Sequence, residues 1–159
     1  MVREGEQGNQ NFTSVDDAIE FAIGQEIKAA TFYREFAAMA THPGVKKMCL
    51  EMAVEEDRHK LMLENLKAGL PSDLATERAI DLKVSDYLRS FYIDPEADQQ
   101  DLLIAAMKSE ARAEKLYLDL AELCTLPEIK AVLLRLAAEE GNHKDVFEKS
   151  YDDNILGSN

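Results

Sequence analysis

Six acidic and imidazole side chains of this sequence have the types and spacing of a binuclear metal site. Two Glu-x-x-His segments, 56–59 and 140–143, contain two of the three histidines of the chain. Residues three apart lie on one face of a helix, so the glutamate and histidine of each segment are able to reach one metal cluster. Carboxylate and imidazole ligands suit iron, manganese and zinc. With one further glutamate upstream of each segment, the candidate ligands are Glu26, Glu56, His59, Glu110, Glu140 and His143.

These candidate ligands recur at matched positions of an internal repeat. Residues 21–65 align without a gap with residues 105–149, and similarity at a constant spacing indicates duplication. The chain is therefore predicted to contain two similar helical hairpins related by a pseudo-twofold axis. His42, the third histidine, aligns with Leu126 and is interpreted as a loop residue. The identical pairs that carry chemistry are Glu26/Glu110, Tyr33/Tyr117, Glu55/Glu139, Glu56/Glu140 and His59/His143.

Capping signals and breaking residues predict four long helices that position these side chains. The segments 14–17 and 125–128 both resemble a capping box at the start of a helix. Gly69, followed by Leu70 and Pro71, ends the second helix. Asp94 with Pro95 supplies a cap and a first-turn proline for the third helix. The expected helices are 14–40, 43–68, 95–124 and 125–149, and the connection 70–94 is expected to include a short helix at 81–91.

Two short loops and one long middle connection favour a particular all-α architecture. They predict a ferritin-like four-helix bundle made of two duplicated helical hairpins joined by a long crossover. A chain of 159 residues is sufficient for one such domain. We expect the bundle to span residues 14–150, with a flexible N-terminus at 1–13 and a C-terminal tail at 151–159.

Each candidate ligand falls near the middle of the apolar line of its helix, traced in alternating steps of four and three residues. Burying one unpaired carboxylate costs on the order of several kcal/mol. The four apolar lines contain no Lys or Arg, so we expect two divalent metal ions to supply the positive charge. One Glu from each of two helices plus Glu-x-x-His from each of two others is the pattern of di-iron and di-manganese bundles. Glu55 and Glu139 fall one step off the line and are interpreted as surface charges.

Composition excludes several other classes of function. A formal net charge of −13 argues against nucleic acid as a partner, because phosphate binding requires a basic surface. No apolar run approaches the length of a membrane span, and the polar segment 1–10 is no secretory signal. A cytoplasmic protein without a membrane partner is therefore expected. Cys49 and Cys124 lack CxxC spacing and are interpreted as small core residues.

Over about residues 14–150 the sequence resembles the rubrerythrin branch of the ferritin-like superfamily. The resemblance rests on Glu26-Ile27-Lys28-Ala29 with Tyr33, Glu56-Asp57-Arg58-His59, Glu110-Ala111-Arg112-Ala113 with Tyr117, and Glu140-Gly141-Asn142-His143. It implies a di-iron centre in a homodimer. It also implies that Glu56 and Glu140 bridge the two irons, that Glu26 and His59 complete one iron, and that Glu110 and His143 complete the other.

The chain departs from the family pattern in two places. The rubredoxin-like domain of full-length rubrerythrins, with its CxxC pairs, has no counterpart here. Electrons are therefore expected from an external donor such as a rubredoxin-type protein. Ala113 stands where those rubrerythrins have an additional glutamate, and the neighbouring Glu114 points about 100° away from it on an ideal helix.

The expected activity is that of a non-haem di-iron oxidoreductase that reduces hydrogen peroxide or dioxygen. Iron handling by a ferroxidase is the first alternative. A module with a purely structural metal and oxygenation of an organic substrate are further ones. Manganese or zinc could replace iron, because the ligand types do not fix the metal. Tyr33 and Tyr117 are either hydrogen-bond donors behind the ligands or amphipathic core residues.

Overall fold

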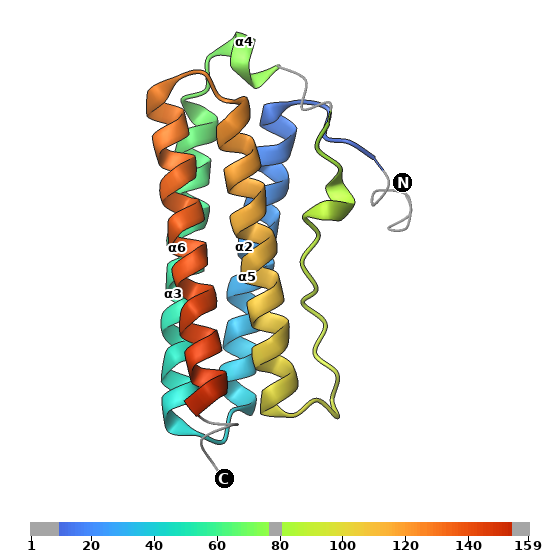
Figure 1. Ribbon diagram of the computed structural model, residues 1–159, viewed down its shortest axis with the longest axis vertical. Coiled ribbons are helices and arrows are strands. Elements are labelled where there is room, and N and C mark those ends of the chain that lie inside the picture. Colours follow the sequence, from blue (N-terminus) through green and yellow to red (C-terminus); the bar gives the residue numbers. More distant parts are fainter. Residues whose placement is uncertain (1–9, 77–80, 154–159) are drawn as a thin grey trace.

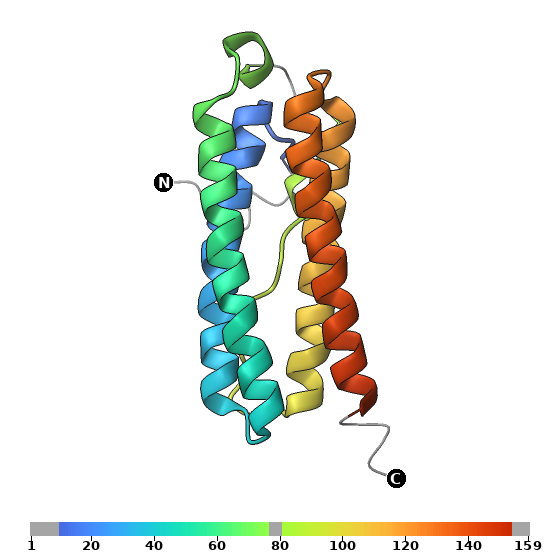
Figure 2. The ribbon, with the colours of Figure 1, turned by 90° about the vertical axis from the view of Figure 1, so that its left-hand side faces the viewer.

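The computed structural model describes residues 10–76 and 81–153. Within them the chain forms four long helices: α2 (Val15–Met39), α3 (Pro43–Ala68), α5 (Gln99–Leu123) and α6 (Pro127–Tyr151). Figures 1 and 2 show α2 with α3 and α5 with α6 as two antiparallel hairpins standing side by side. A long connection, drawn in yellow-green, returns along the α2/α5 side of the bundle, opposite α3 and α6. The predicted ferritin-like bundle with its crossover is confirmed.

The first two helices begin and end where the sequence signals predicted. The Ser14 hydroxyl accepts a hydrogen bond from the Asp17 N–H at 3.0 Å, which satisfies one of the donors left free at a helix start. The Asp17 carboxylate accepts in return from the N–H of Thr13, not of Ser14. At the start of α3, the His42 imidazole accepts from the Gly44 N–H at 3.1 Å. His42 therefore lies in the loop, as predicted, and its side chain caps α3.

The third and fourth helices start differently from the prediction. Asp94 and Pro95 form a turn, in which the Asp94 carboxylate accepts from the Glu96 N–H. The helix α5 begins at Gln99, because Asp98 and Asp101 form a reciprocal capping box that satisfies two backbone donors. The predicted capping box at 125–128 is wrong, since Leu126 occupies the cap position of α6 and has no side chain able to accept a hydrogen bond. Its Pro127 provides the first-turn proline.

The crossover contains less helix than the sequence suggested. A helix at 81–91 is wrong; a 3₁₀ turn at Val84–Asp86, η1, and a four-residue helix, α4 (Ser72–Ala75), are the regular parts described. The backbone around 82–84 instead pairs with residues 10–12 in an antiparallel bridge. This pairing also places Phe12 in the core. Residues 1–9, 77–80 and 154–159 lie outside the described residues.

Two hydrophobic clusters fill the interior, one toward each end of the bundle. One cluster is centred on Ile19, Leu63, Leu120 and Leu133, and the other on Phe32, Phe36, Leu103 and Phe147. Both cysteines are buried in these clusters, as predicted. Burial raises the pKa of Cys49 to about 12, so its thiol stays protonated. Between the two clusters lies a layer of polar side chains.

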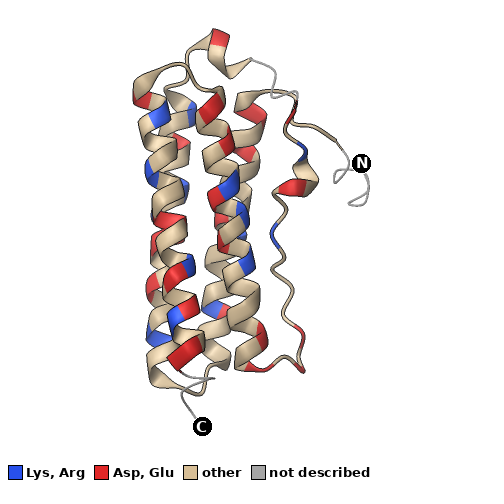
Figure 3. Cartoon of the chain, viewed as in Figure 1, with Lys and Arg blue, Asp and Glu red and all other residues tan. Residues whose placement is uncertain are grey.

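Charged residues are otherwise distributed along the outside of all four long helices (Figure 3). A search of the described helices for a membrane-spanning segment finds none of sufficient length and hydrophobicity.

Candidate metal centre

The six side chains singled out in the sequence meet in the polar layer between the two hydrophobic clusters. Each of the four long helices contributes at least one of them. Five have no exposed surface, and His143 is 7% exposed. The helical spacing of the sequence thus places all six at the same height of the bundle, with their side chains turned inward. They are Glu26, Glu56, His59, Glu110, Glu140 and His143.

The six candidate ligands supply two overlapping groups of four, each with its ligand atoms within 4.8 Å of one another, and a third group joins Glu55 to His59 and His143. The first group combines Glu26 and His59 with two shared glutamates, and the second combines Glu110 and His143 with the same two. Glu56 and Glu140 belong to both groups. A pair of metal ions would therefore find two sites here. Each site has one carboxylate and one imidazole of its own, and the two sites share two further carboxylates.

The histidines reach across from one hairpin to the other. His59 Nδ1 lies 2.7 Å from a carboxylate oxygen of Glu140, and His143 Nδ1 lies 3.2 Å from Glu56. The two imidazole rings are stacked, with centroids 5.4 Å apart. Arg58 of α3 also pairs with Glu139 of α6 at 2.7 Å, so several polar contacts link the two halves beside the centre.

Both tyrosines of the repeat donate hydrogen bonds to candidate ligands of the opposite hairpin. The Tyr33 hydroxyl donates to Glu110, and the Tyr117 hydroxyl donates to Glu26. All four side chains are buried. The two alternatives for the tyrosines are therefore both true: their rings are core residues, and their hydroxyl groups orient the carboxylates.

Ionisation of the four carboxylates is unequal. Burial, followed by the charge of Glu140, raises the pKa of Glu26 and of Glu56. Burial acts in the same direction on Glu140, but hydrogen bonding to the imidazoles and the charge of Arg89 outweigh it, so the pKa of Glu140 is lowered. Burial likewise opposes the charged form of His59, yet the contact with Glu140 leaves its pKa raised. An ionised Glu140 beside a protonated His59 is thus favoured, whereas Glu26 and Glu56 are shifted toward their neutral forms.

The residues present fit a pair of divalent metal ions. One oxygen of each of the four glutamates has no hydrogen-bond partner among the described residues, although all are buried. A buried carboxylate oxygen without a partner is costly, and a metal ion is the partner that would satisfy four of them together. Two carboxylates shared between two sites match the ligand count of a binuclear centre.

A buried arginine lies beside these carboxylates and was not predicted. Arg89, from the crossover, has a side chain that is 2% exposed and nitrogens 3.4 Å from Glu110 and 3.7 Å from Glu26. The expectation that metal ions alone supply positive charge is therefore incomplete. The apolar lines of the helices do lack Lys and Arg, but the cation comes from outside those helices. No periodic pattern marks Arg89, because the segment around it is extended.

The interpretation of Glu139 as a surface charge is wrong. Its carboxylate lies 3.1 Å from His59 Nε2 and 2.7 Å from Arg58, and its side chain is 23% exposed. A carboxylate on the outer nitrogen of a metal-binding imidazole fixes the orientation of the ring. Its repeat partner Glu55 pairs with Arg58 at 2.6 Å and lies near His143. The recurrence of this glutamate in the repeat was the signal that could have identified it.

Ala113 is buried in the core and contributes no ligand. The adjacent Glu114 lies against Gly141, where an added Cβ would meet its carboxylate, and pairs with Lys144 at 3.7 Å. Glu114 therefore does not replace the additional family glutamate, as the helical angle predicted.

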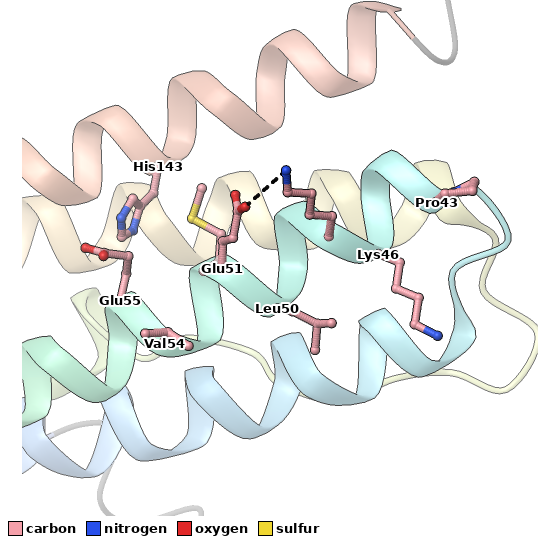
Figure 4. A pocket seen from close by; sticks show the side chains of 9 residues that line it. Pro43, Lys46, Leu50, Glu51, Val54, Glu55 and His143 are labelled. Carbon is pink, nitrogen blue, oxygen red and sulfur yellow. Dashed lines mark ion pairs between the residues drawn. The ribbon is translucent and has the colours of Figure 1, made fainter.

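A groove between α3 and α6 leads to the centre (Figure 4). It has a volume of about 850 Å³ and is lined mainly by α3, with apolar walls at Leu50, Met52 and Val54. His143 forms its inner end, and Glu55 stands beside it. His143 is also the one candidate ligand with exposed surface, so the groove touches the centre at this residue.

Comparisons with known proteins bear on the family and the fold of the chain. The family model described as Rubrerythrin matches residues 17–90 and 101–158. A protein from Thermotoga maritima, described as a ferritin-like diiron-carboxylate protein, superposes with a TM-score of 0.80 at 18% identity, over 92% of this chain and 100% of that one. A hypothetical protein from Pyrococcus furiosus has a TM-score of 0.69 at 27% identity, over 88% and 89% of the two chains. KatB, a manganese catalase from Anabaena, has a TM-score of 0.65 at 20% identity, over 99% and 81%. No curated protein matches the sequence significantly.

Proposed function

The chain belongs to the rubrerythrin family, and on this premise we propose that it is a di-iron oxidoreductase that reduces hydrogen peroxide or dioxygen. Its family and its fold support a metal-dependent redox or iron-binding role in general. The single observation that carries the more specific proposal is the pair of overlapping ligand groups that share Glu56 and Glu140. Carboxylates shared by two ligand groups would hold two metals close enough to act on one substrate.

In this proposal, Glu56 and Glu140 would be shared by the two metals, Glu26 and His59 would hold one of them, and Glu110 and His143 would hold the other. When bound, an iron pair supplies Lewis acidity and two electrons for cleaving an O–O bond. The surrounding side chains hold the ligands in place. Tyr33 and Tyr117 orient two carboxylates, and Glu139 orients the ring of His59. The hydrophobic clusters above and below exclude bulk water.

Access and electron supply are separate requirements of the reaction. The groove ending at His143 admits a small oxidant such as peroxide or dioxygen. Cys49 and Cys124 are far apart in the sequence and have no CxxC spacing, so they are unsuited to an iron–sulfur site. We therefore propose an external electron donor, such as a rubredoxin-type protein. A homodimer, as the resemblance implies, and a cytoplasmic location complete the proposal.

Iron handling is the alternative that the same residues support. A ferroxidase uses a binuclear centre to oxidise Fe(II) and then releases the product, so its centre is a transit site. Manganese is the alternative metal, since one of the similar folds is that of a manganese catalase and the ligand types suit both metals. Stoichiometry and turnover distinguish the two functions: a catalyst keeps two metals per chain while it consumes peroxide repeatedly.

The test is metal analysis of the protein from iron-replete cells, followed by stopped-flow spectroscopy of the reduced form mixed with peroxide. We expect two irons per chain, a spectral change on mixing, and repeated peroxide consumption with an added reductant. Glu56→Gln should abolish all three, whereas Glu64→Gln, at an exposed position of the same helix outside the groove, should not. A reduced spectrum that peroxide leaves unchanged would refute the redox proposal. Uptake of iron far beyond two equivalents would favour iron handling.

A further inference from the structure

Arg89 is held in the bundle by contacts that leave its charge directed at the centre. Its backbone N–H donates to the Gln25 side chain at 3.1 Å, and its Nε donates to the Ser109 hydroxyl at 2.6 Å. The guanidinium also lies 5.3 Å from the ring centroid of Phe91. Gln25 and Ser109 occupy equivalent positions of the sequence repeat. The crossover thus inserts one arginine between two helices that are otherwise related by the pseudo-twofold axis.

The guanidinium faces three of the four glutamates. Its nitrogens lie 3.4 Å from Glu110, 3.7 Å from Glu26 and 4.0 Å from Glu56. Its Nη1 has no hydrogen-bond partner in the described part of the chain. Arg89 is also the one Lys or Arg that is buried among the residues described. Its charge is therefore set against the carboxylates as a group, and it is not consumed by an ion pair with one of them.

The charges of the centre show what this arginine changes. Four ionised glutamates carry −4, and two divalent ions would neutralise them fully. With Arg89 the same loaded centre carries +1, whereas before metal binds Arg89 offsets one negative charge of those glutamates that are ionised. Arg89 therefore stabilises the carboxylates when no metal is bound and repels the metal ions when they are. An arginine is suited to this role, because its guanidinium remains charged when buried.

We propose that Arg89 is a built-in cation that keeps the carboxylate cluster folded before metal binds and weakens the binding of divalent metal. It acts through Glu26, Glu56 and Glu110, so it is a positioning residue and not a metal ligand. The inference rests on the proposed binuclear centre. The crossover then has a function beyond joining the two hairpins, because it supplies Arg89. A metal ion that binds must replace part of the attraction between Arg89 and the glutamates.

Arg89→Met tests this role, because it keeps an unbranched side chain, though a shorter one, and removes the charge. The probe is Mn²⁺, which binds without redox change, titrated into chelator-treated protein at fixed pH and followed by calorimetry. We expect Arg89→Met to bind Mn²⁺ at least about tenfold more tightly than the wild type. Its melting temperature without metal should fall by more than its melting temperature with saturating Mn²⁺. Arg89→Lys, which restores a positive charge, should return both values toward those of the wild type.

Three outcomes would overturn the inference. Equal loss of melting temperature with and without Mn²⁺ would show that Arg89 only fastens the crossover. Weaker Mn²⁺ binding by Arg89→Met would show that its role is to hold Glu110 in a binding orientation. Ser109→Ala removes the Nε acceptor but leaves the charge, so a shift as large as that of Arg89→Met would assign the effect to anchoring. A wild type that fails to bind two Mn²⁺ ions would instead refute the binuclear centre itself, and this inference with it.

Discussion

Replacing Glu56 with glutamine should stabilise the protein when no metal is bound. The same replacement should impair the proposed function, because it removes a candidate metal ligand. Glu56 belongs to both ligand groups. It therefore has three carboxylate neighbours, as does Glu140, and its pKa is raised well above its ordinary value by burial and by Glu140. Glutamine has nearly the same shape and cannot ionise.

The size of the effect follows from two competing costs. At 4.8 Å and an effective dielectric of about 20, each pair of like charges costs about 3.5 kcal/mol. If all four glutamates were ionised, the repulsion of Glu56 by its three carboxylate neighbours would exceed its attraction to Arg89, at 4.0 Å, by about 6 kcal/mol. Protonating Glu56 at pH 7, from its ordinary pKa of 4.5, costs only about 3.4 kcal/mol. Protonation is cheaper, so it limits the penalty that Glu56 imposes.

We therefore expect Glu56→Gln to raise the free energy of unfolding of the metal-free protein by about 3 kcal/mol at pH 7. For a chain of this size, that corresponds to a melting temperature about 6–12 °C higher. The gain should disappear as the pH falls toward 4.5, the ordinary value for the carboxyl group. The reason is that a group with a raised folded-state pKa costs stability only above its unfolded-state pKa.

The assay is urea denaturation of chelator-treated protein at pH 7 and at pH 5. Glu51→Gln is the matched control: Glu51 lies on the same helix, and its side chain is 65% exposed. It should change the free energy of unfolding by less than about 0.5 kcal/mol. A Glu56→Gln protein that is no more stable than the wild type at pH 7, or whose gain does not depend on pH, would refute the electrostatic reasoning.

Three further results are expected from the same arrangement. Glu26→Gln should reduce the metal content to about one ion per chain, because Glu26 belongs to only one ligand group; elemental analysis that still finds two would contradict this assignment. Tyr117→Phe should lower the free energy of unfolding by about 1.5–3 kcal/mol, since it removes a buried hydrogen bond to Glu26. It should also weaken metal binding by about 10- to 100-fold, and a titration that shows unchanged affinity would exclude an orienting role. Removing metal with a chelator should lower the melting temperature of the wild type. The difference should shrink from pH 7 to pH 5, because the pKa values of Glu26 and Glu56 are raised. Calorimetry that finds equal melting temperatures with and without metal would argue against a buried metal cluster.

The sequence alone predicted the part of this protein that depends on helical periodicity. A Glu-x-x-His segment fixes two side chains on one face of a helix, whatever surrounds it. The duplicated hairpin then placed Glu26 and Glu110 at equivalent heights, so the six residues of the candidate centre could be named together. Helix ends followed wherever a local cap determined them, as at Ser14 and Gly69.

Contacts between distant segments could not be predicted in this way. Glu139 lies one step off the apolar line, yet the packing of α3 against α6 brings it to the outer nitrogen of His59. The start of α5 was predicted too early because two capping signals follow one another in the sequence. The first, at Asp94, forms a turn, and the second, the capping box at Asp98, begins the helix.

Local patterns in the chain determined which side chains enter the interior, since a helix repeats its geometry every few residues. The tertiary structure alone decided what meets them there. Arg89 lies in an extended crossover with no periodicity, and its place beside Glu26 and Glu110 depends on the path of that segment along α2 and α5. A pattern within one element specifies a face, but only packing between elements specifies a charge balance.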